Sequence, residues 1–136
     1  MVTDSRRPTD SETEILAVLW EQGPSTVRQV HEVVGDRRGV GYTTVLKLLQ
    51  IMTDKGLVER ESVGRSHVYS ASAPQAQTQA KLVDDLVDRA FGGSASALVM
   101  RALGSRPASR AELDEIRKLL DELSPSSRRG GGEPER

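Results

Sequence analysis

The sequence predicts a mainly α-helical chain with one small β-hairpin. Three amphipathic helical patterns fill residues 10–55, and two short segments rich in β-branched and aromatic residues follow at 57–62 and 67–71. Further helical patterns lie between residues 73 and 124. Three helices followed by a hairpin is the order of a winged helix-turn-helix DNA-binding domain, in which the hairpin is the wing. We therefore expect such a domain followed by a separate helical region.

Composition and motifs exclude several classes of protein. The chain has 136 residues, a formal charge of −1 and no cysteine, which excludes disulfides, thiolate zinc sites and cysteine nucleophiles. His31 and His67 have no partner at metal-ligand spacing, and no phosphate loop, nucleophile elbow or catalytic triad is recognisable. We expect neither an enzyme nor a bound cofactor or metal. No apolar run suits membrane insertion and the first ten residues lack a signal peptide, so the predicted location is cytoplasmic.

The first helix is predicted directly after residues 1–8, which we expect to form a flexible arm. Thr9 and Glu12 have the spacing of a capping box, and apolar residues follow at helical intervals. Gly23 and the proline after it end the helix. Trp20 is expected in the core, whereas the acids of this helix, Glu12 included, are expected to face solvent.

The second helix is predicted to be short and to complete a helix-turn-helix arrangement. Ser25 is expected to cap it, valines at helical spacing give it an apolar face, and Gly35 is expected to end it. Residues 36–41 then form a loop. In that loop Arg37 and Arg38 either contact a phosphate or only face water.

The third helix, predicted over residues 42–55 and closed by Gly56, is the most informative segment. Turning each residue by about 100° separates two faces. The face expected to be buried holds Tyr42, Val45, Leu46, Leu48, Leu49 and Met52. The face expected to be exposed holds Thr43, Thr44, Lys47, Gln50, Ile51 and Asp54. Because free N–H groups and the helix dipole attract anions, the polar residues near the amino terminus favour a phosphate ligand.

The two strand segments are joined by residues 63–66, which we expect to form a hairpin turn with Arg65 at its tip. A wing in this position touches the sugar-phosphate backbone of DNA, so Arg65 is a candidate contact. The winged-helix domain is expected to span residues 9–72.

Residues 73–124 are expected to form a helical dimerisation region, and residues 125–136 a disordered tail. The helices of this region are too thin to form a core alone, so we expect their apolar stripes to pack against a second copy. The expected interface residues are Leu82, Leu86, Leu113, Ile116, Leu120 and Leu123. The alternative is a monomer whose stripes fold back on the winged helix.

The chain resembles the penicillinase repressor family, also called the BlaI/MecI/CopY family, strongly over about the first 72 residues and more weakly as far as Leu123. The matching segments are residues 10–22, 24–33, 41–58 and 59–69. The most specific features are the Tyr42-Thr43-Thr44-Val45 start of the third helix, the Leu48-Leu49-Gln50 step and the Lys55-Gly56-Leu57-Val58 run before the wing. Members of that family are homodimeric winged-helix repressors of inverted-repeat operators. The resemblance therefore implies a sequence-specific transcriptional repressor whose partners are double-stranded operator DNA and a second copy of itself.

The resemblance also implies which residues contact DNA. The expected contacts are Thr43, Thr44 and Lys47 in the groove, Arg65 on the wing, and Gln50, Arg28 and Tyr42 beside them. Gln50 either reads an adenine or faces water. Arg28 either contacts a phosphate or pairs with Glu32 four residues later. Tyr42 is expected to pack inside while its hydroxyl reaches a phosphate.

Three departures from the family pattern limit what is carried over. The cysteine cluster of copper-sensing members is absent, which argues against copper sensing. Where β-lactam-responsive members have a cleaved Asn-Phe bond, this chain aligns Arg101 and Ala102, so relief by a membrane sensor-protease at this candidate cleavage site stays open. Many relatives have a basic residue where this chain has Ile51, which implies fewer phosphate contacts or contact with a thymine methyl group.

Two rival functions fit the same fold. The nearly neutral charge suits a winged-helix module that binds a protein and no DNA. A chromosome-associated protein without sequence preference is the other rival, although it would be expected to contain more lysine.

Overall fold

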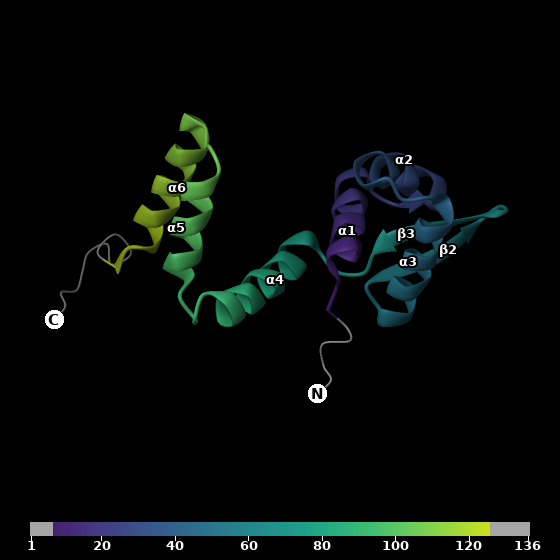
Figure 1. The fold of residues 1–136 in the computed structure, drawn as a ribbon, viewed down its shortest axis with the longest axis horizontal. Helices are drawn as coiled ribbons and strands as arrows, with labels where there is room; N and C mark the ends of the chain where they lie inside the picture. Colours follow the sequence, from purple (N-terminus) through teal and green to yellow (C-terminus); the bar gives the residue numbers. More distant parts are fainter. Residues whose placement is uncertain (1–6, 126–136) are drawn as a thin grey trace. The chain divides into compact units, whose positions relative to one another are not determined.

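A computed structural model describes residues 7–125 of the chain (Figure 1). Most of the predicted arm, 1–8, and nearly all of the predicted tail, 125–136, lie outside the described residues. The described chain is mainly helical with one three-stranded antiparallel sheet, which confirms the predicted fold class. Its elements are α1 (Asp10–Gln22), β1 (Ser25–Thr26), α2 (Val27–Arg38), α3 (Tyr42–Lys55), β2 (Val58–Val63), β3 (Ser66–Ala71), α4 (Gln75–Ala90), α5 (Ala95–Ser105) and α6 (Arg110–Leu123).

The chain divides into two compact units, Met1–Val83 and Asp84–Arg136, and the division falls inside α4. The first unit contains the three helices and three strands of the winged helix. The second contains the end of α4 together with α5 and α6.

The boundaries of α1 agree with the sequence prediction. The hydroxyl of Thr9 accepts a hydrogen bond from the Glu12 amide at 3.2 Å, and the Glu12 carboxylate accepts one from the Thr9 amide at 3.0 Å. This reciprocal pair is the predicted capping box, which satisfies two amides that the helix itself cannot. Gly23 then turns the chain out of the helix with a φ of +84°.

Both predicted ends of α2 are wrong. Ser25 is buried in the short strand β1, and the cap is the next residue, Thr26, which forms a capping box with Gln29. The helix also continues past Gly35 and ends at Gly39, whose φ of +70° is left-handed. Residues 36–38 are therefore helical, and the link to α3 has three residues instead of six.

Gly35 lies inside α2 because another side chain occupies the space beside it. Glycine destabilises a helix interior by roughly 1 kcal/mol relative to alanine, so a packing reason is expected. A Cβ atom at this position would lie 2.7 Å from Nε2 and 2.8 Å from Cδ2 of His31, one turn earlier in the same helix. The ring of His31 therefore requires a residue without a side chain at position 35.

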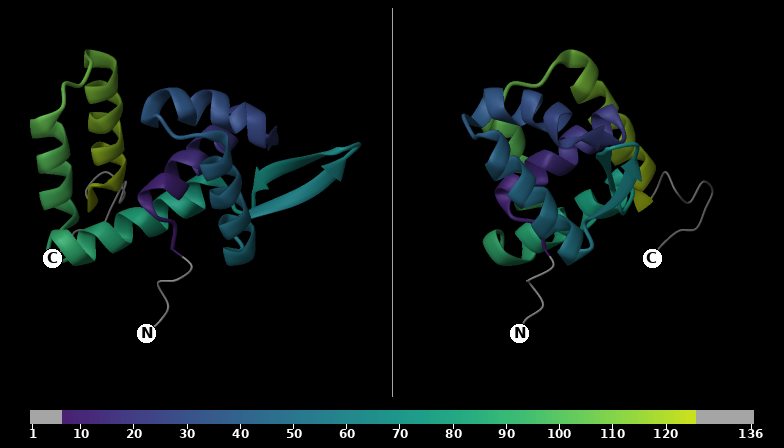
Figure 2. Two further views of the ribbon diagram at one scale, coloured as in Figure 1. Left: turned by 45° about the vertical axis from the view of Figure 1, so that its right-hand side comes forward. Right: turned by 90° about the vertical axis from the view of Figure 1, so that its right-hand side faces the viewer.

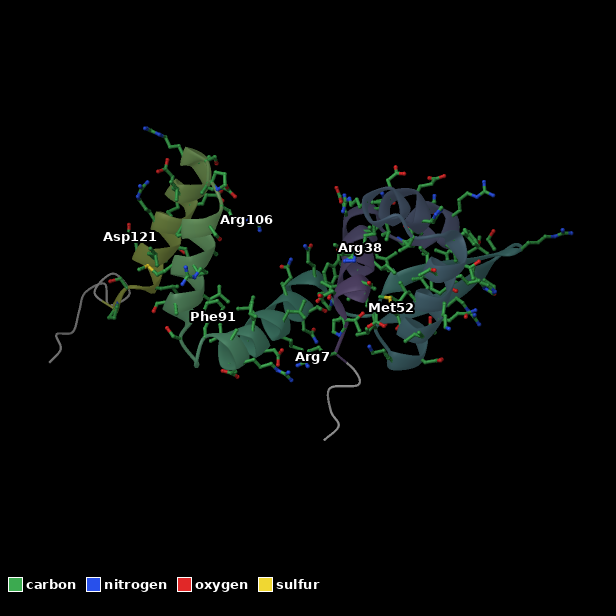
Figure 3. The ribbon with its side chains drawn as sticks, in the orientation of Figure 1. Arg7, Arg38, Met52, Phe91, Arg106 and Asp121 are labelled. Atoms are coloured by element: carbon green, nitrogen blue, oxygen red, sulfur yellow. The ribbon has the colours of Figure 1, made fainter. Side chains whose placement is uncertain are left out.

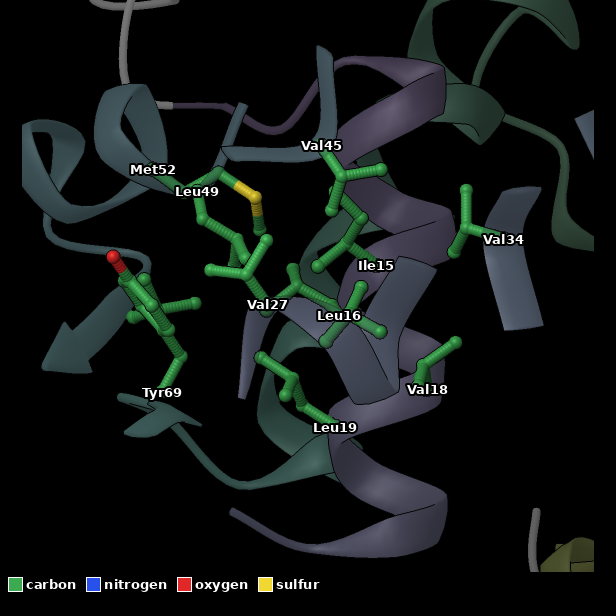
Figure 4. Packing of buried hydrophobic residues seen from close by; sticks show 12 residues of the cluster. Ile15, Leu16, Val18, Leu19, Val27, Val34, Val45, Leu49, Met52 and Tyr69 are labelled. Carbon is green, nitrogen blue, oxygen red and sulfur yellow. The ribbon is translucent and has the colours of Figure 1, made fainter. Parts of the chain in front are cut away.

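The core of the first unit forms where α1, α2 and α3 meet the sheet (Figure 4). Val45, Leu49 and Met52 of α3 are fully buried, and Tyr69 of β3, 1% exposed, closes the core on the sheet side. The cluster consists of Ile15, Leu16, Val18, Leu19, Val27, Val30, Val34, Val45, Leu49, Met52, Val58 and Tyr69. Trp20, predicted to be core, is half-buried against this cluster, and its indole N–H donates to the Ala73 carbonyl at 3.3 Å.

The sheet has the strand order β1-β3-β2, and the pairing of β1 with β3 was not predicted. The turn is shorter than expected, because Val63 and Ser66 pair with each other and leave only Gly64 and Arg65 between the strands. Gly64 has a φ of +62°, a conformation that glycine adopts without strain. Figure 2 shows this hairpin extending away from the helices of the first unit.

A buried ion pair ties the start of α1 to the end of α3. Glu12, predicted to face solvent, is only 2% exposed. Its Oε1 accepts from the Lys55 ammonium group at 2.7 Å, in addition to the Thr9 amide. Lys55 also donates to the carbonyl of Arg7 at 3.0 Å. The carboxylate is thus satisfied by partners from the start of α1 and the end of α3.

Serine residues cap the starts of α5 and α6. Ser94 caps α5 by accepting from the Ala97 amide at 3.0 Å, and Ser109 forms a capping box with Glu112 at the start of α6. α5 runs through Gly104 to Ser105. No residue of α5 or α6 is buried.

Replacing Lys55 with methionine tests the ion pair. The variant keeps an unbranched side chain but leaves the Glu12 carboxylate buried without its counter-charge, so we expect Lys55→Met to lower the free energy of unfolding by about 3 kcal/mol. Urea unfolding followed by the fluorescence of Trp20, the single tryptophan, measures this change.

The matched control is Arg38→Met. It removes the Arg38–Glu14 pair, which also ends on α1 but whose side chains are 37% and 39% exposed. Exposed pairs contribute less than about 1 kcal/mol, so this variant should unfold close to the native protein. Equal losses in the two variants would contradict the role given to Lys55.

Candidate nucleic-acid interface

The exposed face of α3 is the candidate interface. Thr43, Thr44, Lys47 and Gln50 are all exposed, while Val45 and Leu49 between them are fully buried. Since a helix rotates about 100° per residue, the buried residues fix where the four polar side chains lie on the opposite side. The face therefore offers two hydroxyls, one ammonium and one amide to a ligand outside the protein.

The amino terminus of α3 has no side-chain cap. Gly41 occupies the cap position and makes no side-chain hydrogen bond, so the first amides of the helix have no partner from a capping side chain. The link before it is Gly39-Val40-Gly41. Uncapped amides beside exposed threonines can donate to a phosphate oxygen, which the helix dipole also favours.

Two apolar side chains border this face. Tyr42, expected to pack inside, is 48% exposed, and its ring makes an edge contact with the His31 ring at 6.1 Å between centroids. It begins the helix at the rim of the core, so about half of its surface stays in water. Ile51 is 39% exposed, on the polar side as predicted.

The wing concentrates its positive charge at its tip. Arg65 is exposed in the two-residue turn. On the strand β2, Arg60 stands between Glu59 and Glu61, all three exposed, so the strand itself carries more negative than positive charge. An anionic ligand would therefore be attracted to the turn rather than to the length of the wing.

The arginines of α2 differ in their availability. Arg28 is exposed and makes no ion pair with Glu32 among the residues that the structure describes, so that alternative is not realised. Arg37 is exposed near the end of the helix. Arg38 donates to the Glu14 carboxylate at 2.9 Å, and Figure 3 shows it beside α1. Arg28 and Arg37 thus remain available to a ligand.

The described part of the chain offers little for other chemistry. Between residues 7 and 125 no three acidic, histidine or cysteine side chains gather as a metal site would require. His31 bonds the Val40 carbonyl and His67 lies 3.3 Å from the Ser62 hydroxyl, which are structural contacts. No helix within that span combines the length and apolar character that crossing a membrane demands.

Apolar side chains lie uncovered on the helices after the wing. The residues predicted for dimerisation fall into two groups: Leu82, Leu113 and Ile116 are partly buried, whereas Leu86, Leu120 and Leu123 are 48%, 59% and 55% exposed. Within α5, Val99 and Met100 are also 44% and 73% exposed. Soluble proteins rarely leave so many large aliphatic groups together in water, so these faces suit a partner.

The candidate cleavage residues, Arg101 and Ala102, lie in the middle of α5. Both are exposed. Their backbone is helical, however, and a protease that binds extended chain would first have to unwind this part of the helix.

Comparisons with known proteins identify a family and several relatives. A family model described as penicillinase repressor matches residues 8–122. The chain is 35% identical over 116 residues to the transcriptional regulator BlaI of Mycobacterium tuberculosis, covering 84% of this chain and 83% of that protein. It is 20% identical to a penicillinase repressor of Bacillus licheniformis and 17% to one of Staphylococcus aureus, each match covering at least 83% of this chain and 88% of the relative.

Proposed function

The chain belongs to the penicillinase repressor family, and from this premise we propose that it represses transcription as a homodimer bound to an inverted-repeat operator. It is a DNA-binding transcriptional regulator and not an enzyme. The observation that carries the proposal is the exposed polar face of α3, whose position is fixed by fully buried residues on its other side.

In the proposed complex, α3 of each protomer enters a major groove. Thr43, Thr44 and Lys47 meet base edges or phosphates near the amino terminus of the helix, and Gln50 lies one turn further along. Arg28 on α2 and Arg65 at the wing tip hold the sugar-phosphate backbone on either side. Tyr42, which is exposed and not packed inside as the sequence predicted, adds a hydroxyl at the start of α3.

A dimer would cover the exposed leucines and would match an inverted-repeat operator. A two-fold axis places two copies of α3 on half-sites about 34 Å apart, one turn of B-DNA. Pairing Leu120 and Leu123 with their counterparts would remove large apolar groups from water. The repressor would then exclude RNA polymerase by occupying the promoter, in the cytoplasm where the chromosome lies.

Selection of binding sites from random duplex DNA tests this function. We expect an inverted repeat to be enriched, because a symmetric dimer reads the same bases twice. No enrichment would favour the rival in which the winged helix binds a protein, and binding without a consensus would favour a nonspecific chromosomal protein.

On the selected duplex, Lys47→Ala is expected to lower affinity about tenfold, since one base or phosphate contact is lost. Lys81→Ala, an equally exposed lysine on α4, is the control and should bind like the native chain. Gel-shift titrations at several salt concentrations measure both affinity and salt slope. Unchanged affinity in Lys47→Ala would overturn the assignment of α3.

Introducing charge into the uncovered face of α6 tests the dimer. Leu120→Arg places a cation where we propose that two chains meet, so the dimer should dissociate at micromolar concentration in sedimentation equilibrium. Glu115→Arg introduces the same side chain on the other side of α6 and should leave the dimer intact. A monomeric native chain would contradict the proposal directly.

We also propose that cleavage between Arg101 and Ala102 relieves repression. The cut would separate α6, with the exposed Leu120 and Leu123, from the rest of the chain and leave Leu86 behind. Cells exposed to a cell-wall antibiotic should then contain a shortened product on a blot. An intact band throughout the exposure argues that another signal releases the operator.

A further inference from the structure

Two of the three residues in the link that precedes α3 are conformationally permissive. Gly39 has a φ of +70°, and Gly41 lacks a side chain at the cap position. Glycine restricts backbone dihedrals less than any other residue, so the backbone on either side of Val40 does little to fix the direction in which α3 leaves α2. Val40 packs against the core, and contacts from outside the link add to this anchor.

The side chain of His31 holds the link at two points. Its Nε2 lies 3.2 Å from the carbonyl oxygen of Val40, which can only accept, so Nε2 carries the proton and donates. The edge of the same ring meets Tyr42 at 6.1 Å, with the ring planes inclined at 73°, a favourable aromatic geometry. One contact lies before Gly41 and the other after it.

Gly35 makes both contacts possible. A Cβ at position 35 would approach Nε2 and Cδ2 of His31 to 2.7 and 2.8 Å, and the Val40 carbonyl oxygen to 3.3 Å. Because the overlapping atoms are the far end of the His31 side chain, we expect the ring to give way and its contacts with Val40 and Tyr42 to weaken. The glycine therefore fits the ring of His31 rather than ending the helix.

We propose that His31 is a positioning residue for operator recognition. Its ring packs against Gly35, bonds the Val40 carbonyl and contacts the Tyr42 ring, and so orients the amino-terminal half of α3. The inference rests on the proposed function only where the test measures binding to operator DNA. The contacts of His31 with Val40 and Tyr42 exist in the protein without DNA.

A double-mutant cycle in the full-length protein tests it. The variants are His31→Ala, Gly35→Ala and the combination of both. Gly35→Ala is expected to lower affinity for the selected operator about tenfold in the native background, and to change it less than about twofold when His31→Ala is already present. Affinity for unrelated duplex, which depends on charge, should stay the same in all three variants because the lysines and arginines are retained.

Gly104→Ala is the matched control. Gly104 also lies inside a helix, and a Cβ there meets nothing within 4 Å. It should bind the operator like the native chain. An equal loss for Gly35→Ala in both backgrounds, or no loss in the native background, would overturn the proposal. If Gly35→Ala unfolds by itself but folds together with His31→Ala, the midpoints of thermal unfolding of the variants measure the coupling between positions 31 and 35.

Hydrogen exchange without DNA separates this inference from the proposed function. Amides of the link and of the first turn of α3 should exchange faster in His31→Ala and Gly35→Ala, but not in Gly104→Ala. If the two variants exchange faster but the protein selects no operator, the role of His31 in holding the link stands and the proposed repressor function is refuted. If the protein selects an operator but exchange is unchanged and the two substitutions act independently, only the role of His31 is refuted.

Discussion

The buried side of α3 is the constraint on which the rest of the winged helix depends. Val45, Leu49 and Met52 are completely removed from water, and each such side chain contributes about 2 kcal/mol through burial. Because they lie at intervals of three and four residues, they hold the helix in one rotation about its axis. The positions of the polar residues are therefore a by-product of packing, and core substitutions would alter recognition without touching a DNA-facing residue.

Other contacts fix the two ends of the same helix. At its end, Lys55 reaches the Glu12 carboxylate at the start of α1, which a backbone amide already holds. At its beginning, where the backbone contains two glycines, the ring of His31 meets the link and Tyr42. The buried residues in the middle of α3 fix its rotation about its own axis but restrict its tilt and translation less. Contacts at both ends of the helix restrict these remaining movements.

Local patterns predicted most of the fold, and long-range contacts account for what they missed. The capping box of α1, the faces of α3 and the hairpin depend on neighbours in sequence. Ser25 and Thr26 were both suitable caps, and only Gln29, three residues after Thr26, distinguishes them. The burial of Glu12 depends on a lysine 43 residues away. Among the candidate contacts on α3, exposure was predicted correctly for Thr43, Thr44, Lys47 and Gln50. It was predicted wrongly for Tyr42, because the first residue of a helix can lie at the edge of the core although it is on the apolar face.

The missing side chain at position 35 also constrains how this sequence can diverge. A Cβ there would lie within 3 Å of the ring at position 31, so the ring keeps this position only above a glycine. A larger residue at position 35 displaces the ring, and loss of the ring removes the packing reason for a glycine. Among descendants of this protein, the histidine and the glycine should therefore be inherited or replaced together, as a single evolutionary character.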